Sequence, residues 1–249
     1  MKSEIKAFAK VNLFLDITGR LENGYHTLNT VMQQIDLYDE ITAEVSEGNG
    51  IYISCDNPAV PCNEKNIAYK AAAAFLSETG KKARVDIRIK KNIPLEAGMG
   101  GSSTDGAAVL KALNEIYGYP LTDEKLCEIG TGLGADVPFC ITGGTAVCKG
   151  IGEIMTPVQC LKDYVFLIVK PDFSCFARSD WDGSPVITHR EPKPMRVRNI
   201  SICSGVVFCA SSKITNAFPS VRPRMNASGA ISITPREISS EASAMGSIS

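Results

Sequence analysis

The chain has 249 residues, of which 44% are hydrophobic and 21% are charged, a composition typical of folded globular proteins rather than disordered ones. Its 26 Lys and Arg residues stand against 27 Asp and Glu residues, so the net charge of −1 gives no reason to expect nucleic acid or an anionic membrane as a partner. This length predicts one large domain or two small ones.

The number and spacing of the cysteines indicate the cellular compartment in which the protein is expected. The nine cysteines form an odd number and include no C-x-x-C pair, which is typical of a reduced, cytoplasmic protein. The only histidines are His26 and His189, so a structural zinc site has no ligand set of the usual spacing. The first apolar run, residues 11–15, ends at Asp16 and is too short for a signal-peptide core. We therefore expect a cytoplasmic protein with no membrane partner.

Strands and helices are expected to mix along the chain without a strict rhythm. Val85, Ile87 and Ile89 alternate with charged residues and predict the clearest half-buried strand. Such mixing favours an α/β (α+β) fold over a doubly wound one. The expected strands are residues 5–17, 28–45, 51–54, 85–89, 145–148 and 165–169, and the expected helices are residues 63–77, 104–117 and 123–130.

The strongest local signal is the segment 94–106, PLEAGMGGSSTDG, between an expected strand and an expected helix. Four glycines within nine residues permit positive φ and close backbone approach, and a following helix start attracts anions. The segment is not a P-loop, because no Gly-Lys-Ser/Thr follows Gly98, and the dinucleotide fingerprint would need glycine at Ser103. The alternative is a tight turn in which Ser102 and Asp105 form a variant capping box.

Two further segments carry polar residues in unusual places. Lys10 and Asn12 lie inside an early apolar strand, although a lysine there is usually a solvated, outward-facing residue. Asp136 stands in a glycine-framed turn just before Pro138. That carboxylate is either a functional group or the N-cap of a helix with proline just inside it. The residues by themselves leave both interpretations open.

A resemblance to the GHMP kinases is carried by three segments, AKVNLFLDITGRLENGYH, IPLEAGMGGSSTDGAAVL and GLGADVPFCITGGTAVCKG. Within that family they are most similar to the kinases that act on 4-diphosphocytidyl-2-C-methyl-D-erythritol in the non-mevalonate isoprenoid pathway. The resemblance covers residues 1 to about 173. It implies a two-domain GHMP kinase fold, with an ATP-binding N-terminal domain of the ribosomal protein S5 domain 2-like type over 1–156 and a C-terminal domain over 157–249.

The resemblance also implies roles for single residues. Asp136 would be the base that receives the proton of the substrate hydroxyl, and Lys10 would pair with it and with the developing phosphoryl charge. Mg²⁺ would be shared between the ATP phosphates and protein hydroxyls, with Ser102 as the candidate. The residues implied in ATP binding are Pro94, Leu95, Glu96, Ala97, Gly98, Met99, Gly100, Gly101, Ser102 and Ser103.

The substrate implied by the resemblance is 4-diphosphocytidyl-2-C-methyl-D-erythritol, phosphorylated on its 2-hydroxyl. Asn12 would orient the methylerythritol part, and Tyr25 and His26 would contact the cytosine. Two alternatives stay open at this point. One is a GHMP kinase for another small alcohol, and the other is a catalytically inactive nucleotide-binding protein.

The residues after Ser174 do not continue the resemblance. Leucine occurs 14 times up to Leu167 and never in residues 175–249. A third glycine motif of the type Met-Ser-Gly-Ser-Gly-Pro-Thr is expected in a GHMP kinase, and the nearest string, NASGA from Asn226, lacks its second glycine and its proline. We interpret the tail as the product of a reading-frame shift near codon 175. The alternative is a divergent C-terminal domain.

Overall fold

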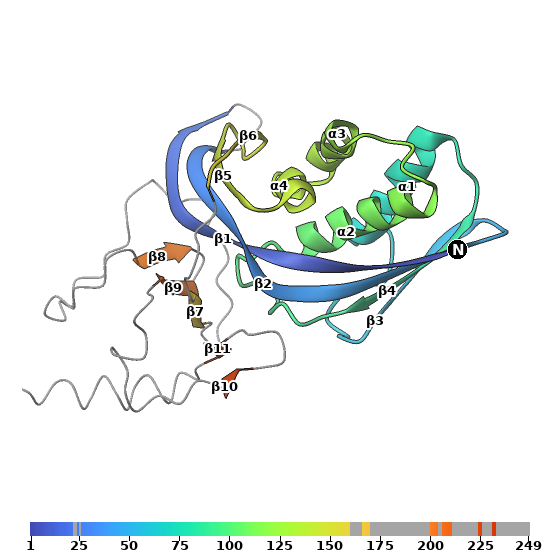
Figure 1. The fold of residues 1–249 in the computed structure, drawn as a ribbon, viewed down its shortest axis with the longest axis horizontal. Coiled ribbons are helices and arrows are strands. Elements are labelled where there is room, and N and C mark those ends of the chain that lie inside the picture. Colours follow the sequence, from blue (N-terminus) through green and yellow to red (C-terminus); the bar gives the residue numbers. More distant parts are fainter. Residues whose placement is uncertain are drawn as a thin grey trace, which may run out of the picture. The chain divides into compact units, whose positions relative to one another are not determined.

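A computed structural model describes residues 1–21, 24, 26–159, 166–169, 200–203, 206–210, 224–225 and 231–232 (Figure 1). The chain divides into two compact units. The first comprises Met1–Leu95 and Met99–Cys160, and the second comprises Glu96–Gly98 and Leu161–Ser249. Each unit is described by itself below.

The first unit is built on a six-stranded sheet with the order β3-β4-β2-β5-β6, to which β1 is added by pairing with β2. The long strands β1 and β2 form an antiparallel hairpin, and the other edge of β2 pairs with both β4 and β5. The strand β3 is parallel to β4. The strands of this sheet are β1 (Lys2–Arg20), β2 (His26–Ser46), β3 (Gly50–Cys55), β4 (Arg84–Lys90), β5 (Thr145–Lys149) and β6 (Ile154–Pro157).

Four helices cover one side of this sheet (Figure 1). The Asn66 side chain accepts a hydrogen bond from the Ala68 N–H at 2.9 Å and so caps the first helix, and Thr122 caps the third in the same way. The second helix has no side-chain cap and follows Gly100, whose backbone is left-handed. The helices are α1 (Ile67–Thr79), α2 (Gly101–Ile116), α3 (Asp123–Leu133) and α4 (Val137–Thr142).

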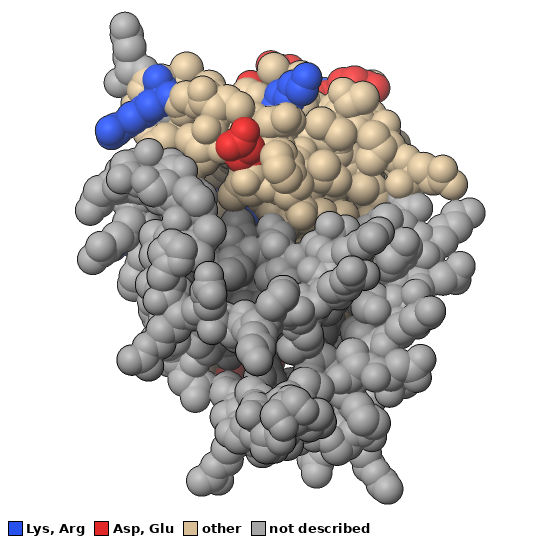
Figure 2. Space-filling view, turned by 90° about the vertical axis from the view of Figure 1, so that its left-hand side faces the viewer, with Lys and Arg blue, Asp and Glu red and all other residues tan. Residues whose placement is uncertain are grey.

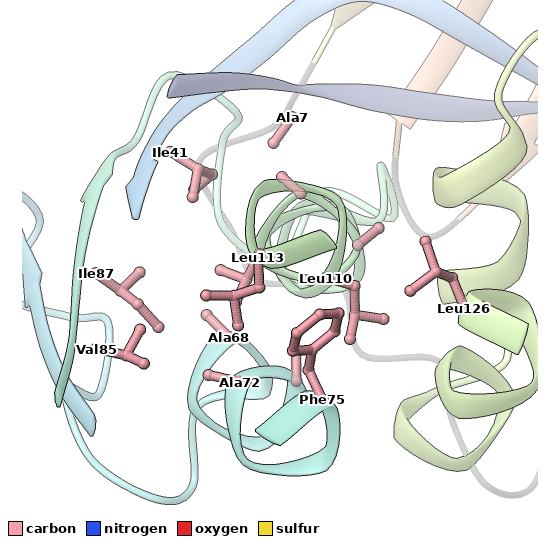
Figure 3. Close-up of a cluster of buried hydrophobic side chains, with 14 of the residues drawn as sticks. Ala7, Ile41, Ala68, Ala72, Phe75, Val85, Ile87, Leu110, Leu113 and Leu126 are labelled. Atoms are coloured by element: carbon pink, nitrogen blue, oxygen red, sulfur yellow. The ribbon is translucent and has the colours of Figure 1, made fainter. Parts of the chain in front are cut away.

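The main core lies between the sheet and these helices, with α2 at its centre (Figure 3). Leu110 and Leu113 of α2 are fully buried. They share the core with Phe75 of α1, Leu126 of α3 and Ile41 of β2. Burial of such large apolar side chains is the dominant favourable contribution to folding. The core thereby fixes α2, whose first turn belongs to the glycine-rich segment.

The second unit contains a five-stranded sheet with the order β10-β11-β7-β9-β8. The strand expected at residues 165–169 is present as β7. Most of residues 175–249 lie outside the described part of the chain, so the interpretation of the tail as a reading-frame shift stays a prediction. The strands are β7 (Phe166–Val169), β8 (Ile200–Cys203), β9 (Val206–Ala210), β10 (Arg224–Met225) and β11 (Ile231–Ser232).

The expected elements are present, with shifts at their ends. The first helix begins at Ile67 rather than at Asn63, because the Asn63 side chain accepts the Lys65 N–H at 3.0 Å and holds a turn instead. The second helix begins three residues before the expected Thr104. The strand β6 was not among the expected elements, and the short helix α4 was expected only as one of the two interpretations of Asp136.

The surface of the described residues carries both signs of charge. On the face shown in Figure 2, lysine and arginine side chains lie among aspartate and glutamate side chains, without an extended area of one sign. Within the described ranges, no helix is long and apolar enough to cross a bilayer.

Candidate active site

Lys10 of β1 lies next to two side chains that the sequence predicted as functional. Its Nζ is 3.1 Å from Oδ2 of Asp136 and donates a hydrogen bond of 2.9 Å to Oδ1 of Asn12. The Lys10 side chain is only 7% exposed, so this ammonium is not an outward-facing strand residue. Lys10 and Asn12 share a face of β1 because they are two residues apart. The pairing of β1 with β2 is irregular between Phe8 and Lys10.

The geometry at Asp136 distinguishes the two interpretations left open by the sequence. Asp136 does occupy the N-cap position of α4, with Pro138 just inside the helix, but its side chain makes no capping hydrogen bond. The carboxylate instead pairs with Lys10 and is 30% exposed. The expected helix start is therefore present, while the carboxylate itself is left to face Lys10 and solvent.

The end of the glycine-rich segment lies against β1. The Met99 carbonyl accepts a hydrogen bond of 3.1 Å from the Lys10 backbone N–H. Gly100 has φ +69°, and a Cβ there would stand 3.1 Å from Cγ of Lys10. Glycine is therefore required at this position both by its backbone conformation and by the stem of Lys10.

The helix α2 starts with unpaired backbone donors. Its first hydrogen bond runs from the Thr104 N–H to the Gly100 carbonyl, at 2.8 Å. The N–H groups of residues 101–103 precede that bond and have no acceptor within the helix. The capping box considered for Ser102 and Asp105 is wrong, since no side chain caps this helix. The Asp105 carboxylate instead forms an ion pair with the buried Lys91.

The ten residues implied in ATP binding occupy the segment between β4 and the first turn of α2. Ala97 and Met99 are buried, while Ser102 is exposed. Glu96 has φ +55°, unusual for a residue with a side chain, and Gly98 has φ +68°. Residues 96–98 belong to the second compact unit, so only residues 94–95 and 99–103 are placed relative to Lys10.

The residues predicted to contact cytosine lie at the other end of the hairpin. His26 opens β2 opposite Arg20, whereas Lys10 pairs with Gln34, eight positions further along β2. At a rise of roughly 3.3 Å per residue, the path along the strand is about 26 Å. Tyr25 lies outside the described residues. The structure thus groups Lys10, Asn12 and Asp136, while His26 lies at the start of β2, eight positions from the residue that pairs with Lys10.

Three buried charged residues beside the glycine-rich segment were missed as a group. Lys91 forms ion pairs with Asp39 and with Asp105, the latter at 2.8 Å. Burial raises the pKa of Asp105 to about 7, the nearby Lys91 opposes that shift, and Asp39 adds to it. A signal was available in β2, because Asp39 stands in the same alternating series as Leu37 and Ile41, which face the core.

Cys140 and Cys148, two thiols close to the Lys10–Asp136 pair, have raised pKa values. Burial, reinforced by the carboxylate of Asp136, raises the pKa of Cys140 to about 12. The same causes raise the pKa of Cys148 to about 11. A thiol is a nucleophile only as its thiolate. At neutral pH both side chains are therefore thiols and not nucleophilic thiolates.

Comparison with known proteins agrees with this architecture. Residues 66–144 match the model of the GHMP kinases N terminal domain. A solved 4-(cytidine 5'-diphospho)-2C-methyl-D-erythritol kinase is similar to the chain, with a TM-score of 0.59 and 35% identity over 69% of this chain and 60% of that one. The mevalonate kinase of Methanococcus jannaschii shares the fold, with a TM-score of 0.54 at 19% identity, over 68% of this chain and 61% of that one.

Relatives with a curated name indicate which group of GHMP kinases the chain resembles most. The 4-diphosphocytidyl-2-C-methyl-D-erythritol kinase of Clostridium botulinum (strain Alaska E43 / Type E3) is 46% identical over 189 residues, which are 75% of this chain and 67% of the relative. The enzyme of the same name from Clostridium beijerinckii is 47% identical, with the same coverage. The enzyme from Clostridium perfringens (strain ATCC 13124) is 49% identical over 68% of this chain and 59% of the relative.

The sheet, its one-sided helical layer and the glycine-rich start of α2 are those of the GHMP kinases, a class of small-molecule kinases. Within that class, the chain belongs to the 4-diphosphocytidyl-2-C-methyl-D-erythritol kinase family. The alignments span about three fifths to two thirds of the length of the relatives.

Proposed function

We propose that this chain carries the machinery for transferring the γ-phosphate of ATP to the 2-hydroxyl of 4-diphosphocytidyl-2-C-methyl-D-erythritol, in the cytoplasm and in the service of isoprenoid precursor synthesis. The observation that supports this most is the Lys10–Asp136 ion pair, with 3.1 Å between Nζ and Oδ2, beside the N-terminus of α2. The relatives that match the chain at 46–49% identity bear the name of this kinase.

The proposed chemistry follows from the two charges. An Asp136 carboxylate oxygen accepts the proton of the substrate hydroxyl. At the same time the hydroxyl oxygen forms a bond to the γ-phosphorus, and the bond between that phosphorus and the ADP oxygen breaks. The Lys10 ammonium lies within reach of the same carboxylate and stabilises the negative charge on the transferring phosphoryl group. Asn12 accepts from Lys10 and so fixes where the ammonium points. Phosphoryl transfer depends mainly on such positioning and charge stabilisation.

The nucleotide phosphates are proposed to lie at the start of α2. The unpaired N–H groups of residues 101–103 and the positive end of the helix dipole both attract phosphate oxygens. Gly100 lets the backbone approach without a side chain. The proposed nucleotide site therefore comprises the segment from Pro94 to Ser103.

The side chains at this site fit a magnesium ion whose ligands come mainly from the nucleotide phosphates. Among the described residues, no three His, Cys, Asp or Glu side chains gather into a metal-binding cluster. Mg²⁺ at a kinase site is commonly bound by substrate phosphates with few protein ligands, and the exposed hydroxyl of Ser102 is the ligand we assign here. When bound, the ion neutralises charge on the phosphate oxygens.

The substrate is proposed to lie along the β1–β2 hairpin. Its cytosine would contact His26 and Tyr25 near the hairpin turn, and its methylerythritol part would lie at Asn12. The separation of His26 from Lys10 along β2 fits a long substrate whose base and reacting hydroxyl are at opposite ends. The Oδ1 of Asn12 accepts from Lys10, so the amide N–H₂ is the group of this side chain that would donate to a substrate hydroxyl.

One observation favours a second candidate function. The tail lacks the closing glycine motif, and a chain without it could bind nucleotide and turn over no alcohol. A transfer assay with γ-labelled ATP separates the candidates, using the diphosphocytidyl substrate, mevalonate and homoserine in parallel. Label transferred only to the diphosphocytidyl compound supports the proposal. Transfer to all three alike indicates another kinase specificity, and ATP binding without transfer in any arm indicates the inactive form.

A further inference from the structure

A buried group of three charged residues connects the two ends of the glycine-rich segment. Lys91 precedes the segment, Asp105 lies near its end and within α2, and Asp39 belongs to β2. The Lys91 ammonium pairs with both carboxylates, and the three side chains are 4%, 3% and 0% exposed, in that order. We call these three residues the buried triad.

The triad also holds the backbone that leads into the segment. Oδ1 of Asp39 accepts the Asn92 N–H at 2.6 Å and the Ile93 N–H at 2.8 Å. Asp39 thus binds three consecutive residues, 91 through 93, by one ammonium and two backbone donors. Hydrogen bonds to a carboxylate are roughly twice as strong as those between neutral groups.

The other end of the segment is held through Lys91. Oδ2 of Asp105 accepts from the Lys91 Nζ at 2.8 Å, across 14 positions of sequence. A Cβ on Gly101 would lie 3.4 Å from that same Nζ, so the ammonium sits beside the first residue of α2. The residues before Pro94 and the first turns of α2 are therefore joined through one buried ammonium.

We propose that Asp39, Lys91 and Asp105 are positioning residues that clamp both ends of the glycine-rich segment, so that the N–H groups at the start of α2 are held ready for the nucleotide phosphates. The role in nucleotide binding rests on the proposed function, while the clamp itself does not. Buried charges are costly to desolvate, and surrounding hydrogen bonds and partners offset that cost only when geometry is well fixed. The buried triad meets this condition by holding the glycine-rich segment in one geometry. In that geometry the backbone N–H groups at the start of α2 are presented to the nucleotide phosphates.

Asp105→Ala is the most direct test. It removes the contact between α2 and the Lys91 ammonium, and it leaves Asp39 and Lys91 as an ion pair with no net charge. Asp105→Asn is the conservative variant, since its amide oxygen can still accept from Lys91. Asn114→Ala is the matched control in the same helix. Asn114 is also buried and makes two hydrogen bonds to the backbone of Leu121, but at the far end of α2.

The primary measurement is amide hydrogen exchange in the full 249-residue chain, which needs no nucleotide. In Asp105→Ala we expect exchange of residues 94–103 to accelerate by about tenfold or more, because local opening becomes cheaper. Asp105→Asn should restore most of the protection. Asn114→Ala should accelerate exchange near residues 117–122 and leave residues 94–103 unchanged. Unchanged exchange at 94–103 in Asp105→Ala, or equal acceleration there in Asn114→Ala, would overturn the clamp.

The second measurement is ATP affinity by calorimetry on the same variants. We expect Asp105→Ala to weaken binding by about tenfold or more, since the donors must then be ordered on binding. Asp105→Asn and Asn114→Ala should stay close to the parent chain. If the exchange pattern follows the expectation but the parent chain binds no ATP, the proposed function fails and the clamp stands. If ATP binds equally well to the parent and to Asp105→Ala, positioning of the phosphates is disproved.

Discussion

The ammonium of Lys10 has two oxygen partners of different kinds, and they suit different tasks. Asn12 offers a neutral amide oxygen at 2.9 Å, which orients the ammonium. Asp136 offers a charged carboxylate that is 30% exposed, so a substrate hydroxyl can reach it. This difference supports the proposed roles of Asn12 in orienting the ammonium and of Asp136 in accepting the proton.

Asp136→Asn should keep nucleotide binding and lower kcat by about 10²-fold or more, the usual scale for loss of a general base. The amide has nearly the same shape but cannot take the proton at neutral pH. Steady-state kinetics and calorimetry on an active, frame-restored enzyme would measure both quantities. Asp86→Asn serves as the control, because it removes a carboxylate of similar exposure on β4 that pairs with Arg84 instead of Lys10. A variant that keeps most of the parent kcat would leave Asp136 as a helix-start residue.

Gly100→Val should disturb Lys10 as well as the loop. A Cβ at this position would stand 3.1 Å and 3.3 Å from the Lys10 stem carbons, and the φ of +69° disfavours a β-branched residue. We expect both ATP affinity and kcat to fall by about tenfold or more, because a displacement of around 1 Å can cost 10²-fold in rate. Unchanged calorimetric affinity together with unchanged kcat would show that neither Lys10 nor the loop depends on this glycine.

The free energy of unfolding should depend on pH through the protonation of Asp105. Burial raises the pKa of this carboxyl to about 7, Lys91 opposes the rise, and Asp39 adds to it. Below about pH 4, Asp105 is protonated in both the folded and unfolded states. As the pH rises to about 7, the unfolded chain releases this proton and the folded chain keeps it, so the contribution of Asp105 to stability is lost at up to about 1.4 kcal/mol per pH unit.

Urea denaturation at pH 5, 6 and 7 would measure this effect by comparing the parent chain with Asp105→Asn. The asparagine variant lacks the titrating group, so its stability relative to the parent should increase as the pH rises across this interval. The comparison removes the titration of other carboxyl groups, which both proteins share. A difference between the two proteins that stays constant with pH would contradict the raised pKa.

At the scale of elements, the approach of α1 to α2 depends on one glycine. A Cβ on Gly106 would stand 2.6 Å from Cγ2 of Ile67, a β-branched side chain at the start of α1 that has little freedom to move. Alanine is favoured over glycine in a helix by about 1 kcal/mol, whereas overpacking a core typically costs about 1–3 kcal/mol. The close contact therefore outweighs the helix propensity.

Gly106→Ala should accordingly lower the free energy of unfolding, by up to about 2 kcal/mol. Gly132→Ala is the matched control, since Gly132 is also helical, in α3, and a Cβ there meets nothing within 4 Å. That variant should gain up to about 1 kcal/mol. Thermal or denaturant unfolding of both variants checks the pair, and equal effects of the two substitutions would contradict the packing argument.

At the scale of the whole molecule, the two parts of the chain differ in composition. Residues 175–249 contain no leucine and no closing glycine motif, whereas residues 1–174 contain 14 leucines. In the first unit, large apolar side chains such as Leu110 and Leu113 are fully buried and join the sheet to its helices. The tail has no leucine, the residue type that supplies these contacts in α2, so it would have to build a domain interface from other apolar side chains.

We therefore expect the 249-residue chain to transfer phosphate far more slowly than a version in which the reading frame is restored after Ser174. Sequencing the gene around codon 175 and assaying both versions with the diphosphocytidyl substrate would check this. The restored frame should encode a Gly-Ser-Gly-Pro motif. Equal kcat/KM for the two versions, or the lack of any downstream frame with that motif, would disprove the interpretation of the tail.

The sequence by itself determined the type and order of most elements in residues 1–159, β6 and α4 excepted, because the alternation of β4, the caps and the glycines act over a few neighbouring residues. It also indicated the glycine-rich segment and the candidates Lys10, Asn12 and Asp136. Only the tertiary structure decided that Asp136 faces Lys10 instead of capping α4, and that Asp105 pairs with Lys91 instead of closing a capping box. These choices depend on contacts between β1 and α4, and among β2, the segment after β4, and α2, which lie far apart in sequence. A carboxylate near a helix start can accept hydrogen bonds from the first backbone N–H groups of that helix. Here the folded chain brings an ammonium from a distant strand or loop to within about 3 Å of each carboxylate, and at that distance the attraction between opposite charges competes with the local cap.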